Sequence, residues 1–186
     1  MKTNKLTNNK ISIEETYLIM LKRFNSAVDL VKEKLAEIDD LEIIILKGHL
    51  LIENAIENNL ELLIGQANIS DLKLRFEQKL LLFHYLDCRM TRDGIETSEL
   101  YLILKSINIL RNSVAHKLDP NHEELEFLLS EHDRLTIHGY AYYLPESYDL
   151  LSNNTKLKRL ITECVFSLNL SGLKHWADLK SKTKIL

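Results

Sequence analysis

Apolar side chains recur at steps of three and four residues along most of this chain, and this spacing restricts the fold more than any other feature. The first such stripe consists of Ile13, Tyr17, Leu21, Phe24, Val28, Val31, Leu35 and Ile38. This spacing places apolar side chains on one face of a helix. Five glycines and two prolines in 186 residues favour long helices with few tight turns. The sequence therefore predicts an all-α protein.

Local end signals divide the apolar pattern into successive helices. Asp39 and Asp40 are expected to cap a second helix that runs to about Ile64. The centre of this helix, residues 43–51, is apolar nearly all round and is expected to be the most buried part of the chain. The later helices are expected to open at Ser70-Asp71, Thr97-Ser98, Asp119-Pro120 and Asn154, with Pro120 at a first helical position and Gly172 as a candidate break in the last helix.

Short connections between these helices predict an up-and-down antiparallel helical bundle. Residues 12–132 form this bundle in our interpretation, and residues 133–186 add a C-terminal part that packs on the same domain. The stretch Leu135–Leu144 is aromatic and partly alternating, so it is interpreted either as a small hairpin or as an ordered loop. An extra helix follows it.

Composition excludes several classes of protein. The N-terminal residues lack the apolar run of a signal peptide, and the longest apolar stretch, Leu41–Ile52, contains charged residues. The two cysteines form no CxxC pair, and a reduced cytoplasmic setting without a membrane partner is expected. Net charge is -3, while residues 156–186 carry seven basic and two acidic residues. This end of the chain can attract an anion or can simply be a solvated helix end.

The run from Arg111 to His116 carries the side chains with the most suggestive chemistry. Asn112 and His116 lie four residues apart and share a helix face, whereas Arg111 lies about 140° around the helix and roughly 7.5 Å along it from His116. Histidine can act as a general acid or base near neutral pH, and the arginine fork can stabilise charge on a phosphorane. Asparagine can orient either side chain. The same residues can also simply stabilise a helix end.

The run Arg111-Asn112-x-x-Ala115-His116-x-Leu118 resembles the signature of the HEPN superfamily (higher eukaryotes and prokaryotes nucleotide-binding), in which arginine and histidine are separated by four to six residues. Residues 47–57 also resemble the second helix of bacterial members, which often directs an acidic residue toward the site. Glu53 matches that role, and Lys47 is a further candidate. The resemblance covers residues 13–120 as architecture.

This resemblance implies a metal-independent endoribonuclease that cleaves RNA through a 2′,3′-cyclic phosphate and needs no cofactor. Its catalytic residues would be Arg111, Asn112 and His116, with Glu53 and Lys47 in secondary roles. The resemblance also implies a homodimer, and a bacterial defence or toxin–antitoxin setting with an antitoxin or defence-system partner.

Two other interpretations stay open. The chain can be a non-catalytic HEPN-like module that binds or regulates a protein partner, or a helical interaction protein in which Arg111 and His116 only cap a helix. His49 is interpreted as a core histidine. His122 opens no HExxH motif, and the other histidines lack the spacing of metal ligands.

Overall fold

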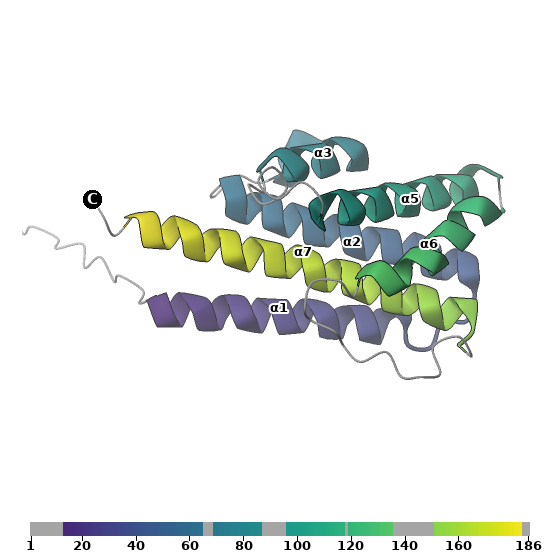
Figure 1. The fold of residues 1–186 in the computed structure, drawn as a ribbon, viewed down its shortest axis with the longest axis horizontal. Coiled ribbons are helices and arrows are strands. Elements are labelled where there is room, and N and C mark those ends of the chain that lie inside the picture. The colour runs from purple at the N-terminus through teal and green to yellow at the C-terminus, as the bar shows by residue number, and fades with distance from the viewer. Residues whose placement is uncertain (1–12, 65–68, 87–95, 118, 136–150, 184–186) are drawn as a thin grey trace, which may run out of the picture.

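The computed structural model describes residues 13–64, 69–86, 96–117, 119–135 and 151–183 (Figure 1). Within these ranges all regular structure is helical, which confirms the predicted all-α helical bundle. Its elements are α1 (Ile13–Leu35), α2 (Leu41–Ile64), the 3-10 helix η1 (Ile69–Leu72), α3 (Phe76–Leu86), α5 (Glu96–Lys117), α6 (His122–Leu135) and α7 (Asn153–Thr183).

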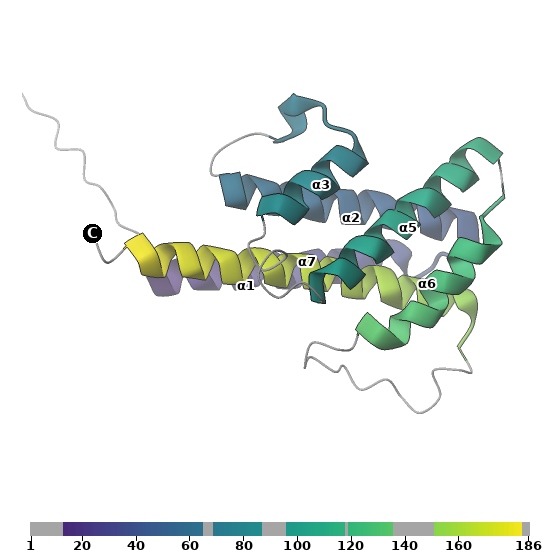
Figure 2. The same cartoon turned by 45° about the horizontal axis from the view of Figure 1, so that its top comes forward.

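Helix α2 is the centre of the bundle. On one side it packs along α7, which also lies against α1; on the other it contacts α3 and α5. Figures 1 and 2 show α1 and α7 on one side of α2 and α3 on the other, while α5 crosses in front of α2 in Figure 2. One hydrophobic core joins residues of all six α-helices in the described part of the chain. The expected boundary between residues 132 and 133 falls inside α6.

The start of α2 follows its sequence signal. The Oδ1 atom of Asp40 accepts a hydrogen bond of 3.0 Å from the backbone N–H of Ile43, as an N-cap residue does. Gly48, in the buried part of α2, lies against Ile161 of α7, and a Cβ atom at this position would lie 2.2 Å from Cδ1 of Ile161. The missing side chain therefore lets α7 approach α2 closely.

Two helix starts differ from the prediction. The third helix does not open at Ser70-Asp71, because Lys73 adopts a left-handed backbone (φ 49°) that ends η1. Helix α6 does not begin with Pro120. Asn121 caps it instead: its Oδ1 atom accepts hydrogen bonds from the backbone of Glu123 (3.2 Å) and Glu124 (3.5 Å).

The C-terminal region is largely helical where it is described. Leu135 is the last residue of α6, and residues 136–144 of the expected hairpin lie outside the described residues. Helix α7 continues through Gly172 without a break and contributes a row of buried apolar side chains to the core. These are Leu157, Leu160, Ile161, Cys164, Val165 and Leu168.

Candidate active site

The last two turns of α5 carry the three predicted catalytic residues. Val114 is buried and anchors this end of the helix in the core. Arg111 and Asn112 are half-buried, and an Nη1–H of Arg111 donates a hydrogen bond of 2.9 Å to Oδ1 of Asn112. His116 is exposed, and its side chain makes no hydrogen bond or ion pair with another described residue. The structure thus joins Arg111 to Asn112 and leaves the imidazole of His116 accessible to solvent.

Arg111 and His116 lie on different sides of α5. Arg111 continues the row of Leu104 and Asn108, which are buried against the bundle. His116 continues a row that is open to solvent in part or in full, and this row comprises Leu102, Lys105, Ile109 and Asn112. Five residues of α-helix separate the two side chains by about 140°. Within one chain, the two side chains therefore leave α5 in different directions.

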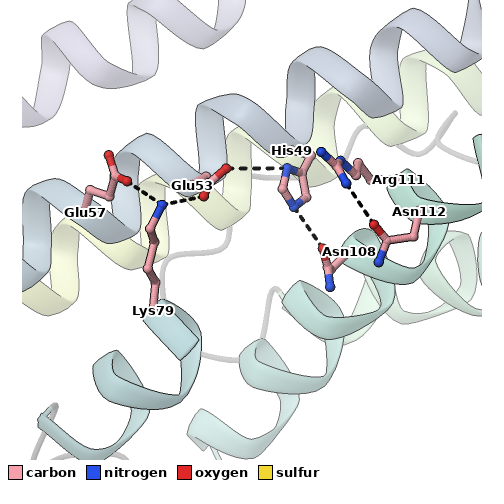
Figure 3. Close-up of polar contacts among 7 residues, drawn as sticks. All are labelled: His49, Glu53, Glu57, Lys79, Asn108, Arg111 and Asn112. Atoms are coloured by element: carbon pink, nitrogen blue, oxygen red, sulfur yellow. Dashed lines mark hydrogen bonds and ion pairs between the residues drawn. The ribbon is translucent and has the colours of Figure 1, made fainter. Parts of the chain in front are cut away.

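A buried histidine of α2 lies beside Arg111 (Figure 3). His49 is only 2% exposed, and its ring stacks at a tilt on Phe76 with 4.3 Å between ring centroids. Its Nε2 atom lies 3.1 Å from Oδ1 of Asn108. Burial lowers the pKa of His49 below its usual value, and the positive charges of Arg111 and Lys79 act in the same direction, against the opposing effect of Glu53.

An ion cluster continues from His49 along the same face of α2 (Figure 3). The Nζ atom of Lys79, from α3, lies 2.5 Å from Oε1 of Glu53 and 2.5 Å from Oε1 of Glu57. Burial acts to lower the pKa of Lys79, but the hydrogen bonds to the two carboxylates outweigh it and raise the pKa overall. The other oxygen of Glu53 lies 4.0 Å from Nδ1 of His49. Glu53, a predicted site residue, therefore connects Lys79 to His49.

Lys47 does not belong to this cluster. It is exposed on α2, and two helical residues separate it from His49 by about 200° of rotation. It makes no ion pair with any residue in the described ranges. The structure therefore brings Glu53 toward Arg111 by way of His49, and it leaves Lys47 on another side of the helix.

Sequence reasoning did not identify Lys79, Glu57, Asn108 or Glu77 as parts of this cluster. Asn108 links two helices, because its Nδ2–H donates a hydrogen bond of 3.3 Å to Oε1 of Glu77 on α3 while its Oδ1 faces His49 on α2. A partial signal was present in the sequence, since His49, Glu53 and Glu57 recur every four residues and so share a helix face. The burial of His49 confirms that it is a core histidine. The expectation that its polar atoms are satisfied there is wrong for Nδ1, which has no hydrogen-bond partner among the described residues.

Among the described residues, no three His, Cys, Asp or Glu side chains are grouped so that they could hold a metal ion. None of the helices in the described ranges has the length and apolarity needed to cross a membrane. No protein-family model matches the chain, and no curated protein or solved structure matches it either.

Proposed function

We propose that this chain is a HEPN-like, metal-independent endoribonuclease that acts on RNA in a bacterial defence or toxin–antitoxin setting. The observation that carries the proposal is the end of α5, where Arg111 is held by Asn112 and an exposed His116 follows on the same core helix. This arrangement supplies a fixed cation for a phosphate and a base that can exchange protons with solvent.

The proposed reaction needs only these groups. His116 removes the proton of a ribose 2′-hydroxyl, and the 2′-oxygen attacks the adjacent phosphorus. Arg111 stabilises the negative charge that develops on the non-bridging oxygens, and Asn112 keeps its guanidinium in place. The bond from phosphorus to the 5′-oxygen breaks, and that oxygen takes up a proton from water, while the imidazolium of His116 returns its proton to the solvent. The products are a 2′,3′-cyclic phosphate and a 5′-hydroxyl end.

A homodimer reconciles this chemistry with the directions of the two side chains. Arg111 and His116 leave α5 about 140° apart, so we expect His116 of one protomer to meet Arg111 of its partner across a twofold axis. The open row of α5 that carries His116 contains apolar surface at Leu102, which is 50% exposed. We expect this row to form part of the dimer contact.

The proposal is tested by incubating a mixed-sequence RNA with the protein in excess EDTA and identifying the product ends. We expect cleavage with 2′,3′-cyclic phosphate ends, and a loss of at least about a hundredfold in Arg111→Ala and His116→Ala. His122→Ala is the matched control, because His122 is an exposed histidine at the start of α6. Equal activity in all folded variants would remove the nuclease assignment.

Mixing variants tests whether the site forms between protomers. Arg111→Ala and His116→Ala are each inactive in this proposal, but a mixed dimer regains one intact pair at its interface. Random exchange of subunits at equal concentrations makes half of the dimers mixed, and each mixed dimer has one intact site out of two. The mixture should therefore regain about a quarter of wild-type activity. No recovery after verified exchange of subunits would place both groups in one protomer.

A non-catalytic binding module is the second candidate. The observation that favours it is that Arg111 already has a partner, Asn112, and lies beside the buried His49. Such a module would bind RNA or a protein through the open row of α5 without cleaving. RNA binding by a folded dimer that leaves the RNA intact would favour this function over the nuclease.

A further inference from the structure

The imidazole of His49 has a defined tautomer in this structure. Glu77 accepts a hydrogen bond from Nδ2 of Asn108, so the Oδ1 atom of Asn108 faces His49. An amide oxygen only accepts hydrogen bonds. In the neutral imidazole the proton therefore resides on Nε2, which donates to Asn108, and Nδ1 carries a lone pair.

The Nδ1 atom of His49 is buried and has no hydrogen-bond partner among the described residues. The group in front of it is a carboxylate oxygen of Glu53, 4.0 Å away. Two hydrogen-bond acceptors thus face each other inside the protein, which is unfavourable for a buried polar atom. A proton on Nδ1 would remove the conflict, because the imidazolium would pair with Glu53.

Neighbouring charges on three helices determine whether that proton binds. Glu53, on the helix of His49, favours the imidazolium, whereas Lys79 of α3 and Arg111 of α5 oppose it. Glu57 and Glu77 act further away, through their contacts with Lys79 and Asn108. Helix α7 meets this part of α2 with the apolar Ile161, at Gly48. Burial also opposes the charge and keeps the pKa of His49 below its usual value.

An anion bound to Arg111 would shift this balance, because it offsets one of the two positive charges that oppose protonation of His49. We propose that His49 is a positioning residue for Arg111 and that it takes up a proton on Nδ1 when a phosphodiester of RNA binds there. The proposed function supplies the identity of the anion. Linkage requires the reciprocal effect as well: the protonated form of His49 binds the anion more tightly than the neutral form.

The position of Asn108 explains how His49 also fixes the geometry of Arg111. Asn108 precedes Arg111 by three residues and Asn112 by four, so all three lie within about one turn of α5. The hydrogen bond from His49 to Asn108 therefore ties α2 to α5 directly before the anion-binding turn. Protonation of Nδ1 leaves this bond in place, since the Nε2 proton is present in both forms.

Nitrogen NMR of the histidine rings provides the first test. The free wild-type protein is titrated around pH 6.5 and compared with Arg111→Ala and with Lys22→Ala, which removes an exposed cation of α1. His49→Gln identifies the resonance. We expect the Nε2–H tautomer in the free protein, and a higher pKa of His49 in Arg111→Ala but not in Lys22→Ala. An unchanged pKa in folded Arg111→Ala would overturn the coupling.

The second test adds an anion at constant ionic strength, with chloride as the reference. The probes are inorganic phosphate and a 2′-O-methyl RNA oligonucleotide, which lacks the attacking hydroxyl and cannot be cleaved. We expect both probes to raise the pKa of His49 in the wild type and not in Arg111→Ala. Calorimetry of the RNA in two buffers of different ionisation enthalpy should show proton uptake that falls by up to about one proton per site in His49→Gln and is retained in His122→Gln, at an exposed histidine outside the site.

The outcomes separate this inference from the proposed function. A response to phosphate but not to RNA supports the role of His49 and removes RNA as the ligand. Cleavage of RNA without any response of His49 overturns the role of His49 and leaves the nuclease in place. Equal proton uptake in wild type and folded His49→Gln also overturns it. If His49 does not respond and the RNA is not cleaved, both proposals are overturned.

Discussion

The two sides of α2 are built from different interactions. Toward α7 the contact is apolar and close, and Gly48 leaves room for Ile161. Toward α3 and α5 the same helix carries His49, Glu53 and Glu57, which meet polar side chains of both neighbours. The same buried helix thus holds the bundle together by packing on one side and gathers charges on the other.

The difference supports the position that we propose for the functional site. Packing of apolar surface stabilises a fold in proportion to the area buried, whereas buried ion pairs contribute little net stability because desolvation opposes them. The α7 side can therefore offset the energetic cost of the charged side. Departures from an apolar core are expected mainly at functional sites, and the charged side leads to Arg111.

The largest loss of stability should come from disrupting the apolar packing of α7. Leu160 of α7 is 0% exposed, and Leu160→Ala should lower the free energy of unfolding by about 3 kcal/mol, because it removes buried methyl groups and leaves a cavity. The matched control is Leu50→Ala, at a leucine of α2 that is 61% exposed, which should cost less than about 0.5 kcal/mol. Urea unfolding measures both, and equal losses would contradict the assignment of the core.

A smaller loss of stability should follow from removing the cation of the ion cluster on the charged side of α2. Lys79→Met keeps the length of the side chain but leaves Glu53 and Glu57 close together without their cation, so we expect a loss of about 2 kcal/mol at pH 7. The control is Lys105→Met, at an exposed position of α5. An unfolding free energy equal to that of the wild type would show that the cluster contributes no specific pairing.

The contribution of Lys79 to the free energy of unfolding should change with pH in one direction only. Its pKa is raised in the folded state above the usual 10.5, so the stabilisation is fully present below pH 10.5 and is lost as pH rises through the folded-state value. The wild type should therefore approach the stability of Lys79→Met only in strong alkali. Equal stability of wild type and Lys79→Met near neutral pH would contradict this direction.

The close approach of α7 to α2 is tested by a paired substitution. Gly48→Ala should destabilise the protein by about 1 kcal/mol, since the clash with Ile161 outweighs the better helix propensity of alanine. Ile161→Val removes the Cδ1 atom that lies nearest to the added Cβ. The double variant should therefore be more stable than the sum of the two single effects. Simple additivity would show that the two helices do not meet at this point.

The smallest effect should be the contribution of His49 to the change of stability with pH. Its pKa is lowered in the folded state, so its neutral form contributes stability above pH 6.5 that is lost as pH falls through the folded-state value. The stability difference between wild type and His49→Gln should therefore shrink, or change sign, on acidification, with His122→Gln as control. A difference that grows as pH falls would contradict the burial of a neutral imidazole.

Local signals were sufficient for much of the fold. The apolar stripe predicted α1 and the Asp40 cap predicted the start of α2, because both signals act within a few residues of the helix they define. The start of α3 escaped prediction, because Lys73 adopts a left-handed backbone although no glycine marks the turn in the sequence. The cap of α6 by Asn121 rather than by Asp119-Pro120 also depends on distant contacts, since the Asn121 N–H donates to Oγ of Ser113 on α5.

The candidate site was predicted in part for the same reason. Arg111, Asn112 and His116 occupy adjacent turns, so their spacing could be evaluated from the sequence. Lys79 is the single lysine of α3, where a lysine would be expected in solvent, and its burial follows from Glu53 and Glu57 on another helix. Such pairing between helices leaves no local pattern, and the link from Asn108 to His49 was missed for that reason.

The most direct test of the central claim, that Arg111 and His116 act on the same phosphodiester, is single-turnover cleavage of RNA by wild type, both single alanine variants and the double variant. Groups that act together in one transition state are strongly non-additive. We expect the double variant to be about as slow as each single variant, each at least about a hundredfold below wild type. Multiplicative losses in the double variant, or full activity in either folded single variant, would contradict the claim.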